Sequence, residues 1–460
     1  MTPFFYDHRL CSLAAAATPL LAAARFLISV KEGMTMDWEP WQALQRKSNH
    51  VVVKLLFLAI FVVLSFRLLF SLFDEFRPVP VSPADMAARE APAESMVADV
   101  LGLGDDINGN RCDLFTGQWI PNPSGPTYTN ESCRFIEPPQ NCMKNGRPDT
   151  EYLFWRWKPN DCDVSPFDAK RFLDTMKNKN WALVGDSILR NQVQSLICLL
   201  SKVEEPVEVD HDEQYKSRRW HFHSHNFNIS LIWSPFLIKA EIFENDEGVS
   251  KSESRLHIDT LDHKWTSLYN SFDYVVISGG QWFLKSAIYV ENNKVVGCHY
   301  CPKLNLSEIS LEYAYNRVLN AIYSFIKTSE HKPIVIYRTW TPQHFEHGEW
   351  FSGGLCNRTE PYKAVESGGR DVDNFMRTIE LNAFAKAVAA EETWSGARLK
   401  LLDTFQLAVL RPDAHPGPYR AFHPFEHGKT VKVQYDCLHW CLPGAIDVWN
   451  DLMIKLVMDE

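Results

Sequence analysis

The chain has 460 residues, of which 45% are hydrophobic and 23% charged. This balance is typical of a globular protein and excludes a disordered or collagen-like chain. The formal net charge of -10 argues against nucleic-acid binding through general basicity. The 15 Trp and 11 Cys need a reason, because a chain of this length can form its core without disulfides.

The N-terminal segment contains an Ala- and Leu-rich stretch over residues 10–30. Three interpretations are open: a second, weak hydrophobic segment, a transit-like peptide, or an extension from an upstream start codon. We favour the extension for residues 1–35, because Met34 or Met36 would begin an ordinary short tail.

Residues 51–73 form the most apolar stretch of the chain and are long enough to span a bilayer as a helix. Lys54 can snorkel from one end, whereas Arg67 is a stronger objection. A buried core helix or a cleavable signal sequence is the alternative. Basic residues precede the stretch and acidic residues follow it, so we expect a type II signal anchor with residues 1–50 as its cytosolic tail.

The segment after the anchor, residues 74–111, is rich in Pro, Ala, Glu and Gly and has no hydrophobic period. We expect a flexible luminal stem. Four sequons and ten of the Cys follow the anchor, and together they indicate an oxidising lumen. The expected glycosylation sites are Asn130, Asn228, Asn305 and Asn357.

The globular part begins with residues 112–165, which hold four Cys and many Pro and Gly and predict a disulfide-stapled lobe. In residues 166–460, short apolar runs alternate with helical patterns, which favours an α/β fold with a parallel sheet. The strands are expected at 181–187, 274–278, 333–339 and 399–403. The helices are expected at 188–200, 308–327, 373–391 and 446–458.

The first of these strands ends at Gly185-Asp186-Ser187, directly before a predicted helix. A serine at a strand-to-helix turn is well placed for nucleophilic catalysis, because free backbone N–H groups at the helix N-terminus can stabilise an oxyanion. The tripeptide alone recurs by chance and leaves a purely structural role open.

A candidate base lies near the C-terminus, where Asp436 and His439 are three residues apart. In a turn, the carboxylate can hold one imidazole nitrogen while the other faces Ser187. Cys437 and Cys441 flank the histidine, so a metal site is the alternative. We expect disulfides instead and no metal, because luminal cysteines are usually oxidised.

Two blocks, WALVGDSILRNQVQSLICLL (181–200) and YDCLHWCLPGAIDVWND (435–451), resemble the signatures of the plant trichome-birefringence-like family. The resemblance spans residues 112–456. It implies a Golgi membrane polysaccharide O-acetyltransferase with a luminal GDSL/SGNH-like esterase domain, a three-layer α/β/α sandwich around a central parallel sheet. YTNESC, GCHYCP and LRPDAHP further resemble the branch acting on xyloglucan, whereas sister branches acetylate xylan, mannan or pectin.

The resemblance makes Ser187 the nucleophile, His439 the general base and acid, and Asp436 its orienting carboxylate. GDSL enzymes also use a Gly and an Asn as oxyanion donors. That Asn is absent beside Gly280, which leaves Gln281 or a backbone N–H as the donor. The residues expected at the oxyanion hole or pocket are Gly185, Asp186, Arg190, Asn191, Gln192, Gly280 and Gln281.

The family's disulfide pairing, carried over, is Cys112–Cys162, Cys133–Cys198, Cys142–Cys441 and Cys356–Cys437. It leaves Cys298 and Cys301 bonded to each other or free. Trp155, Trp157, Trp282, Trp340 and Trp350 lie in or near the family blocks, where they either line a glycan groove or pack in the core.

The expected reaction is ping-pong acetyl transfer, with no bound cofactor but with an acetyl donor, acetyl-CoA or another acetyl carrier. The expected partner is a polysaccharide acceptor, xyloglucan first, and association with other Golgi glycan-synthesis proteins is compatible with this role. Two alternatives stay open: an acetyl esterase that transfers to water, and a polysaccharide-binding protein with an inactive esterase fold.

Overall fold

The computed structural model describes residues 112–160, 162–164, 167–243, 252–363, 369–389, 398–426 and 433–458. The predicted tail, signal anchor at 51–73 and stem lie outside these ranges. Among the helices described, none has the length and apolar character needed to cross a bilayer.

A central sheet of seven strands organises the fold, in the order β13-β12-β9-β3-β6-β5-β4. Its strands are β3 (Asn180–Gly185), β4 (Val207–His211), β5 (Arg218–Phe222), β6 (Phe227–Trp233), β9 (Tyr274–Ile277), β12 (Ile334–Arg338) and β13 (Arg398–Leu402). The run from β13 to β6 is parallel, which confirms the four predicted strands.

The sheet as a whole is mixed, which corrects the expectation of a parallel one. Strands β4, β5 and β6 pair antiparallel. The connection between β5 and β6 is a single short turn, too short for the crossover that a parallel pair needs. Strand β4, at the edge of the sheet, has the sequence VEVDH, and β5 beside it has RRWHF, so both lack the apolar runs that marked the inner strands.

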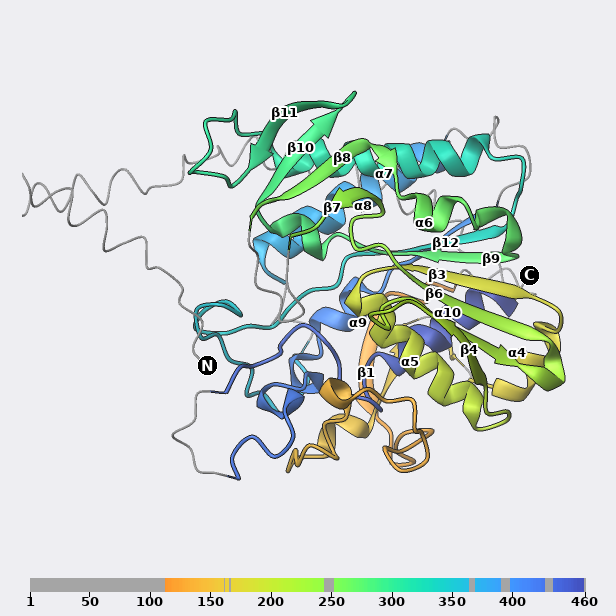
Figure 1. Ribbon diagram of the computed structural model, residues 1–460. Helices are drawn as coiled ribbons and strands as arrows, with labels where there is room; N and C mark the ends of the chain where they lie inside the picture. Colours follow the sequence, from red (N-terminus) through yellow and green to blue (C-terminus); the bar gives the residue numbers. More distant parts are fainter. Residues whose placement is uncertain are drawn as a thin grey trace, which may run out of the picture. The chain divides into compact units, whose positions relative to one another are not determined.

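Helices cover both faces of this sheet (Figure 1). One face carries α4 (Ala169–Thr175), α5 (Ser187–Ser201) and α10 (Asp447–Met458), and the other carries α7 (Leu311–Thr328) and α8 (Asp371–Ala389). Helix α7 is amphipathic, with buried residues recurring three and four positions apart from Ala314 to Ile326. Its N-terminus is capped by Ser310, whose hydroxyl accepts from the N–H of Tyr313.

Two further sheets were not predicted from the sequence. One has the order β11-β10-β8-β7 and lies against α7. It consists of β7 (Ile238–Glu241), β8 (Ser254–Leu261), β10 (Ala287–Glu291) and β11 (Lys294–His299). The other is a pair in the N-terminal lobe, β1 (Gly117–Pro121) and β2 (Trp155–Pro159). Short helices α6 (His263–Thr266) and α9 (Phe405–Val409) complete the α and β elements described.

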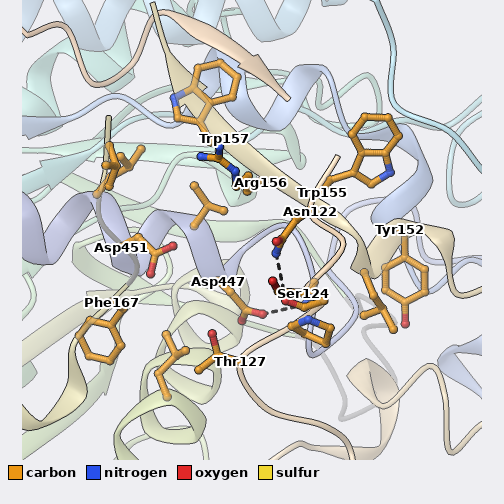
Figure 2. A pocket seen from close by; sticks show the side chains of 18 residues that line it. Asn122, Ser124, Thr127, Tyr152, Trp155, Arg156, Trp157, Phe167, Asp447 and Asp451 are labelled. Carbon is orange, nitrogen blue, oxygen red and sulfur yellow. Dashed lines mark hydrogen bonds between the residues drawn. The ribbon is translucent and has the colours of Figure 1, made fainter. Parts of the chain in front are cut away.

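The lobe meets α10 around a cavity of about 550 Å³. Figure 2 shows Trp155 and Trp157 of β2 on one side and Asp447 and Asp451 of α10 on another. Asp447 is held by the hydroxyls of Tyr128 and Ser195. The lobe is therefore joined to the esterase-like part in part through α10.

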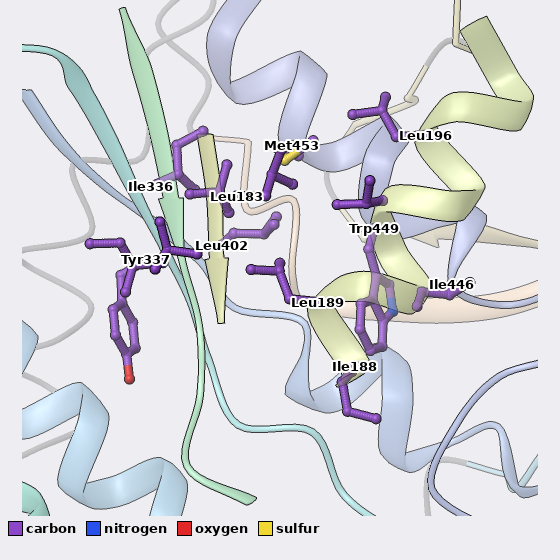
Figure 3. Close-up of a cluster of buried hydrophobic side chains, with 14 of the residues drawn as sticks. Leu183, Ile188, Leu189, Leu196, Ile336, Tyr337, Leu402, Ile446, Trp449 and Met453 are labelled. Carbon is purple, nitrogen blue, oxygen red and sulfur yellow. The ribbon is translucent and has the colours of Figure 1, made fainter. Parts of the chain in front are cut away.

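The core between α5, α10 and the sheet is apolar and fully buried (Figure 3). Leu189 and Leu196 of α5 face Trp449 and Met453 of α10, beside Leu183 of β3. Nearly all of α5 is buried, because it lies between the sheet and α10. The helix that begins at the candidate nucleophile is therefore a rigid central element.

Five disulfides join cysteines of the described ranges, and four are the pairs that the family resemblance implied. The fifth joins Cys298 to Cys301, which answers the alternative that the sequence left open. Cys133–Cys198 ties the lobe to α5, and Cys142–Cys441 closes a loop across 299 residues. Covalent ties across such long loops restrict the unfolded chain most strongly.

The tryptophans are mainly core residues. Trp340 is fully buried and Trp157 is 4% exposed, and each donates its indole N–H to an acceptor inside the protein. Trp155 and Trp282 are half-buried, and Trp350 is exposed. Packing therefore accounts for two of the five, and the other three stay available to a ligand.

The sequons differ in their surroundings. Asn305 and Asn357 are exposed and lie outside helices and strands, and Asn130 is half-buried in a turn. Asn228 lies within β6, where its side chain is bonded to Asn180 and His221. A glycan at Asn228 would break these bonds inside the sheet, so the structure argues against that one predicted site.

Candidate active site

The turn from β3 to α5 presents Ser187 at the first position of the helix. Asp186 caps the helix, with its Oδ1 accepting from the N–H groups of Ile188 at 3.0 Å and Leu189 at 3.4 Å. Gly185 is required here, because a Cβ would lie 2.1 Å from the carbonyl oxygen of Ser278. Ser187 is half-buried at the positive end of the helix dipole.

The carboxylate of Asp436 holds the imidazole of His439. Its Oδ2 lies 2.8 Å from Nδ1 of the ring, and its Oδ1 accepts from the N–H groups of Leu438 and His439. Because Nδ1–H donates to the carboxylate, Nε2 carries the lone pair and can act as a general base. Nε2 is buried and has no hydrogen-bond partner in the structure.

The two carboxylates beside the candidate nucleophile and base differ in their electrostatics. Burial raises the pKa of Asp186, and the charges of Arg338 and His439 oppose that rise, so His439 interacts with the residue next to Ser187. Burial alone would also raise the pKa of Asp436. The charge and hydrogen bonds of His439, aided by Arg420, instead hold the Asp436 pKa well below its usual range. Asp436 is therefore the ionised partner of the ring, and Asp186 is the helix cap.

Asn191 links the two halves of the site. Its Oδ1 accepts from the main-chain N–H of Trp440 at 2.7 Å, next to His439, and its side chain is fully buried. Asn191 lies one turn after Ser187 on the same face of α5. Its Oδ1 fixes the loop of His439 against the helix of the nucleophile. Its Nδ2 is buried and has no hydrogen-bond partner in the structure, and its place in the oxyanion hole or pocket stays a prediction.

Gln192, which was also expected in the pocket, is hydrogen-bonded to α10. Its carboxamide contacts Asn450 of α10 at 3.3 Å, and the Asn450 amide donates back to the Gln192 carbonyl at 3.1 Å. Since successive helical residues are turned by about 100°, five positions after Ser187 is a different face. Gln192 is part of the packing between α5 and α10.

Arg190 remains at the rim of the site. It is half-buried, lies 3.8 Å from the carboxylate of Glu137 in the lobe, and its guanidinium is 5.6 Å from the Trp233 ring centroid. Both contacts keep its charge near the end of β6. Arg190 is thus the one member of the block after Ser187 that stays accessible to a substrate.

The third expected segment follows β9, at Gly280 and Gln281. Gly280 has φ +113°, and a Cβ there would lie 2.8 Å from the hydroxyl of Tyr315. The 3-10 helix η5 (Gln281–Leu284) begins directly after it. The side-chain amide of Gln281 donates to the carbonyl of Thr341. This engagement disfavours Gln281 as an oxyanion donor and favours a backbone N–H.

Several residues that support the site were not singled out from the sequence. Arg338 is buried and interacts electrostatically with Asp186. His344 and His415 form buried hydrogen bonds behind the His439 loop. In the sequence, these residues lie in blocks that were recognised only by their resemblance to the family. Nothing in the sequence around either histidine indicates that it would be buried behind the His439 loop.

One group of possible metal ligands occurs among the described residues, namely Cys298, Cys301 and Glu308. Both sulfurs of this group are in a disulfide, so they offer no thiolate. Cys437 and Cys441, which flank His439, are bonded to Cys356 and Cys142. The cysteines around the base therefore fix the chain instead of presenting metal ligands.

Comparison with known proteins confirms the family resemblance. The PC-Esterase model, a GDSL/SGNH-like acyl-esterase family found in Pmr5 and Cas1p, matches residues 164–456, and the PMR5 N-terminal domain matches residues 110–163.

Relatives from Arabidopsis thaliana match most of the chain. Protein trichome birefringence-like 23 is 47% identical over 432 residues, 93% of this chain and 99% of that protein. Protein trichome birefringence-like 26 is 53% identical over 357 residues, 77% of this chain and 79% of that protein. Xyloglucan O-acetyltransferase 1 is 43% identical over 351 residues, 75% of this chain and 80% of that protein. The chain therefore belongs to the PC-esterase family of GDSL/SGNH-like acyl esterases, alongside trichome birefringence-like proteins and xyloglucan O-acetyltransferases.

Proposed function

We propose that the protein is an O-acetyltransferase that moves acetyl groups onto hydroxyls of a plant cell-wall polysaccharide, with xyloglucan as the preferred acceptor. The observation that carries the proposal is the Asp436–His439 pair, whose Nε2 has no partner and whose loop is bonded through Trp440 to Asn191 of the helix that begins at Ser187. The choice of xyloglucan rests on relatives named xyloglucan O-acetyltransferase at 41–43% identity.

In the first half-reaction, His439 Nε2 takes the proton of the Ser187 hydroxyl while Oγ attacks the acetyl carbonyl of the donor. His439 then returns the proton to the leaving group, and an acetyl-serine remains. The donor is acetyl-CoA or another acetyl carrier. Backbone N–H groups of Ser187 and Gly280 hold the oxyanion, and ionised Asp436 stabilises the imidazolium.

In the second half-reaction, a sugar hydroxyl gives its proton to His439 and attacks the acetyl-serine. The new ester forms on the sugar, and His439 returns the proton to Ser187 Oγ. Water attacking in place of the sugar would make the same site an esterase. The half-exposed Trp155 and Trp282 and the exposed Trp350 are available to contact sugar rings.

The proposed location is the Golgi membrane in a single-pass type II orientation, with this domain in the lumen. Five disulfides support an oxidising compartment. Exposed sequons at Asn305 and Asn357 fit the same location. Association with other Golgi glycan-synthesis proteins belongs to this proposal.

The test compares the full-length wild type with Ser187→Ala and with Ser201→Ala, a matched control at the other end of α5. Each is incubated with acetyl donor and xyloglucan, xylan, mannan or pectin oligosaccharides, and products are identified by mass spectrometry. We expect acetylated xyloglucan from the wild type and from Ser201→Ala, but not from Ser187→Ala.

Three outcomes would contradict parts of this proposal. Equal transfer by Ser187→Ala would rule out the acetyl-serine. Acetate release without acetylated glycan would favour the esterase. Acetylation of xylan, mannan or pectin in preference to xyloglucan would retain the mechanism and replace the acceptor.

A further inference from the structure

Two buried histidines that the mechanism does not use stand behind the base loop, residues 436–441. Nδ1 of His415 lies 2.6 Å from the carbonyl oxygen of His439. Nε2 of His415 lies 2.7 Å from Nδ1 of His344, and Nε2 of His344 lies 2.9 Å from the carbonyl oxygen of Val409. The rings are 4% and 8% exposed, so no bulk water replaces these contacts. Together they form a hydrogen-bond relay that ends on the main chain of the base.

The number of ring protons in the relay follows from its hydrogen-bond partners. Carbonyl oxygens only accept hydrogen bonds, so His415 Nδ1 and His344 Nε2 must each carry a hydrogen. The middle contact joins two nitrogens, and one of them must donate. The complete relay therefore needs three ring protons, whereas two neutral imidazoles carry two. When all three hydrogen bonds are made, it carries one extra proton and one positive charge.

The surroundings contain groups that favour and groups that oppose this charge. Those facing the pair are Arg147, Tyr362, Arg370, Asp373, Asp413, Asp436 and His439. The carboxylates favour the charge, and so does the Trp440 ring, whose centroid lies 4.4 Å from that of His415. Burial opposes it and lowers the pKa of both histidines. The proton is therefore held less tightly than on an exposed histidine, and it is lost as the pH rises.

The same pair contacts the base loop through its main chain. The N–H of His344 donates to the carbonyl of Cys437 at 2.9 Å, and the carbonyl of Ala414 accepts from the N–H of Cys441 at 3.0 Å. The segments that carry His344 and His415 thus contact the loop on both sides of His439. A change in the relay would therefore alter the position of the His439 ring relative to Ser187.

We propose that His415, supported by His344, is a positioning residue that holds the main chain of His439 through a relay sharing one extra proton. The inference rests on the proposed role of His439 as the base. It predicts that acetyl transfer has an alkaline limb, because the relay loses its extra proton as the pH rises.

The experiment uses two substitutions of the same residue in the full-length chain. His344→Asn can place an amide N–H where Nδ1–H lies and donate to neutral His415, without adding a charge. His344→Leu keeps bulk but donates nothing. For His344→Leu we expect kcat to fall about tenfold or more with the acceptor KM little changed, because a small displacement of a catalytic group is costly. For His344→Asn we expect recovery of much of the lost kcat and absence of the alkaline limb.

Equal losses in the Leu and Asn variants, or an effect on KM alone, would overturn the relay. Thermal unfolding of both variants separates a folding defect from a positioning defect. His415→Asn against His415→Leu repeats the comparison at the second ring, since the Asn amide can still donate to the His439 carbonyl.

A second readout is independent of acetyl transfer. In full-length chain labelled with ¹⁵N-histidine, NMR should show a low-field proton shared by two ring nitrogens in the wild type and not in either His344 variant. Absence of this signal throughout about pH 5 to 8 would overturn the relay whatever the activity. If the signal is present but Ser187→Ala transfers acetyl as well as the wild type does, the proposed function fails and the relay stands.

Discussion

The two halves of the candidate site are positioned in different ways. Ser187 is held by its neighbours in sequence: β3 ends, Asp186 caps α5, and the helix begins. His439 is held by contacts from distant segments, including Asn191 of α5, His415, and disulfides to Cys142 and Cys356. A strand-to-helix turn can place a nucleophile by itself, whereas an irregular loop needs tertiary contacts to fix a base.

The largest effect is expected at the joint between these halves, in Asp436→Asn. An amide in place of the carboxylate can hold the ring in the wrong tautomer, and it removes the charge that stabilises the imidazolium. We expect kcat to fall by about 10⁴-fold, measured as the initial rate of acetyl transfer at saturating acceptor. A reduction below about tenfold would show that another carboxylate, with Asp186 the first candidate, orients His439.

Removing one covalent tie of the base loop tests its dependence on distant segments. We expect the double variant Cys356→Ser with Cys437→Ser to lose about 2–5 kcal/mol of unfolding free energy, measured by denaturant unfolding. The matched control is Cys298→Ser with Cys301→Ser, which opens a bridge between residues only three apart. If both variants lose equal stability and equal activity, the long-range bridge has no special role at the base.

Asn191 tests the contact that joins the two halves directly. Asn191→Ala leaves the buried N–H of Trp440 without its acceptor, which should cost about 1–3 kcal/mol, and we expect kcat to fall with it. Asn191→Asp retains an acceptor oxygen and should retain more activity. The measurements are unfolding free energy and kcat side by side. If Asn191→Ala changed neither quantity, the contact between Asn191 and Trp440 would not be needed to position the base loop.

The smallest effect is expected from pH, through Asp436. Its pKa lies well below the usual range in the folded protein, so its stabilising contribution is present above the unfolded-state pKa of about 3.9 and is lost as the pH falls below it. The difference in unfolding free energy between wild type and Asp436→Asn should stay constant above about pH 5 and shrink below about pH 4. A difference that already shrinks near pH 6 would show that a group other than Asp436 is its source.

The nucleophile turn at Ser187 could be predicted from the sequence, whereas the surroundings of His439 could be predicted only in part. Apolar runs such as YVVIS identified the inner parallel strands, and Gly185-Asp186-Ser187 located the start of α5. The separation of three residues between Asp436 and His439 correctly predicted that the carboxylate holds the imidazole. Strands β4 and β5 were missed because polar residues interrupt their sequences, VEVDH and RRWHF, and this is also why the sheet was expected to be parallel throughout.

Membership of a sequence block does not tell which way a side chain points. Asn191 and Gln192 follow the nucleophile in sequence, yet one binds the base loop and the other packs on α10. His344 and His415 are 71 residues apart and meet only in the folded chain. No local pattern of charge or hydrophobicity indicates such a meeting.

The bridge between Cys142 and Cys441 has a consequence for the order of biosynthesis. Its first cysteine is synthesised 299 residues before its partner. Throughout that interval the lobe must keep a reactive thiol available, and the base cannot yet be in place. The protein should therefore acquire its catalytic geometry after synthesis of the polypeptide, when an oxidant joins an early segment to a late one. A cell that limits this oxidation would accumulate chains with the nucleophile turn formed and the base still unplaced.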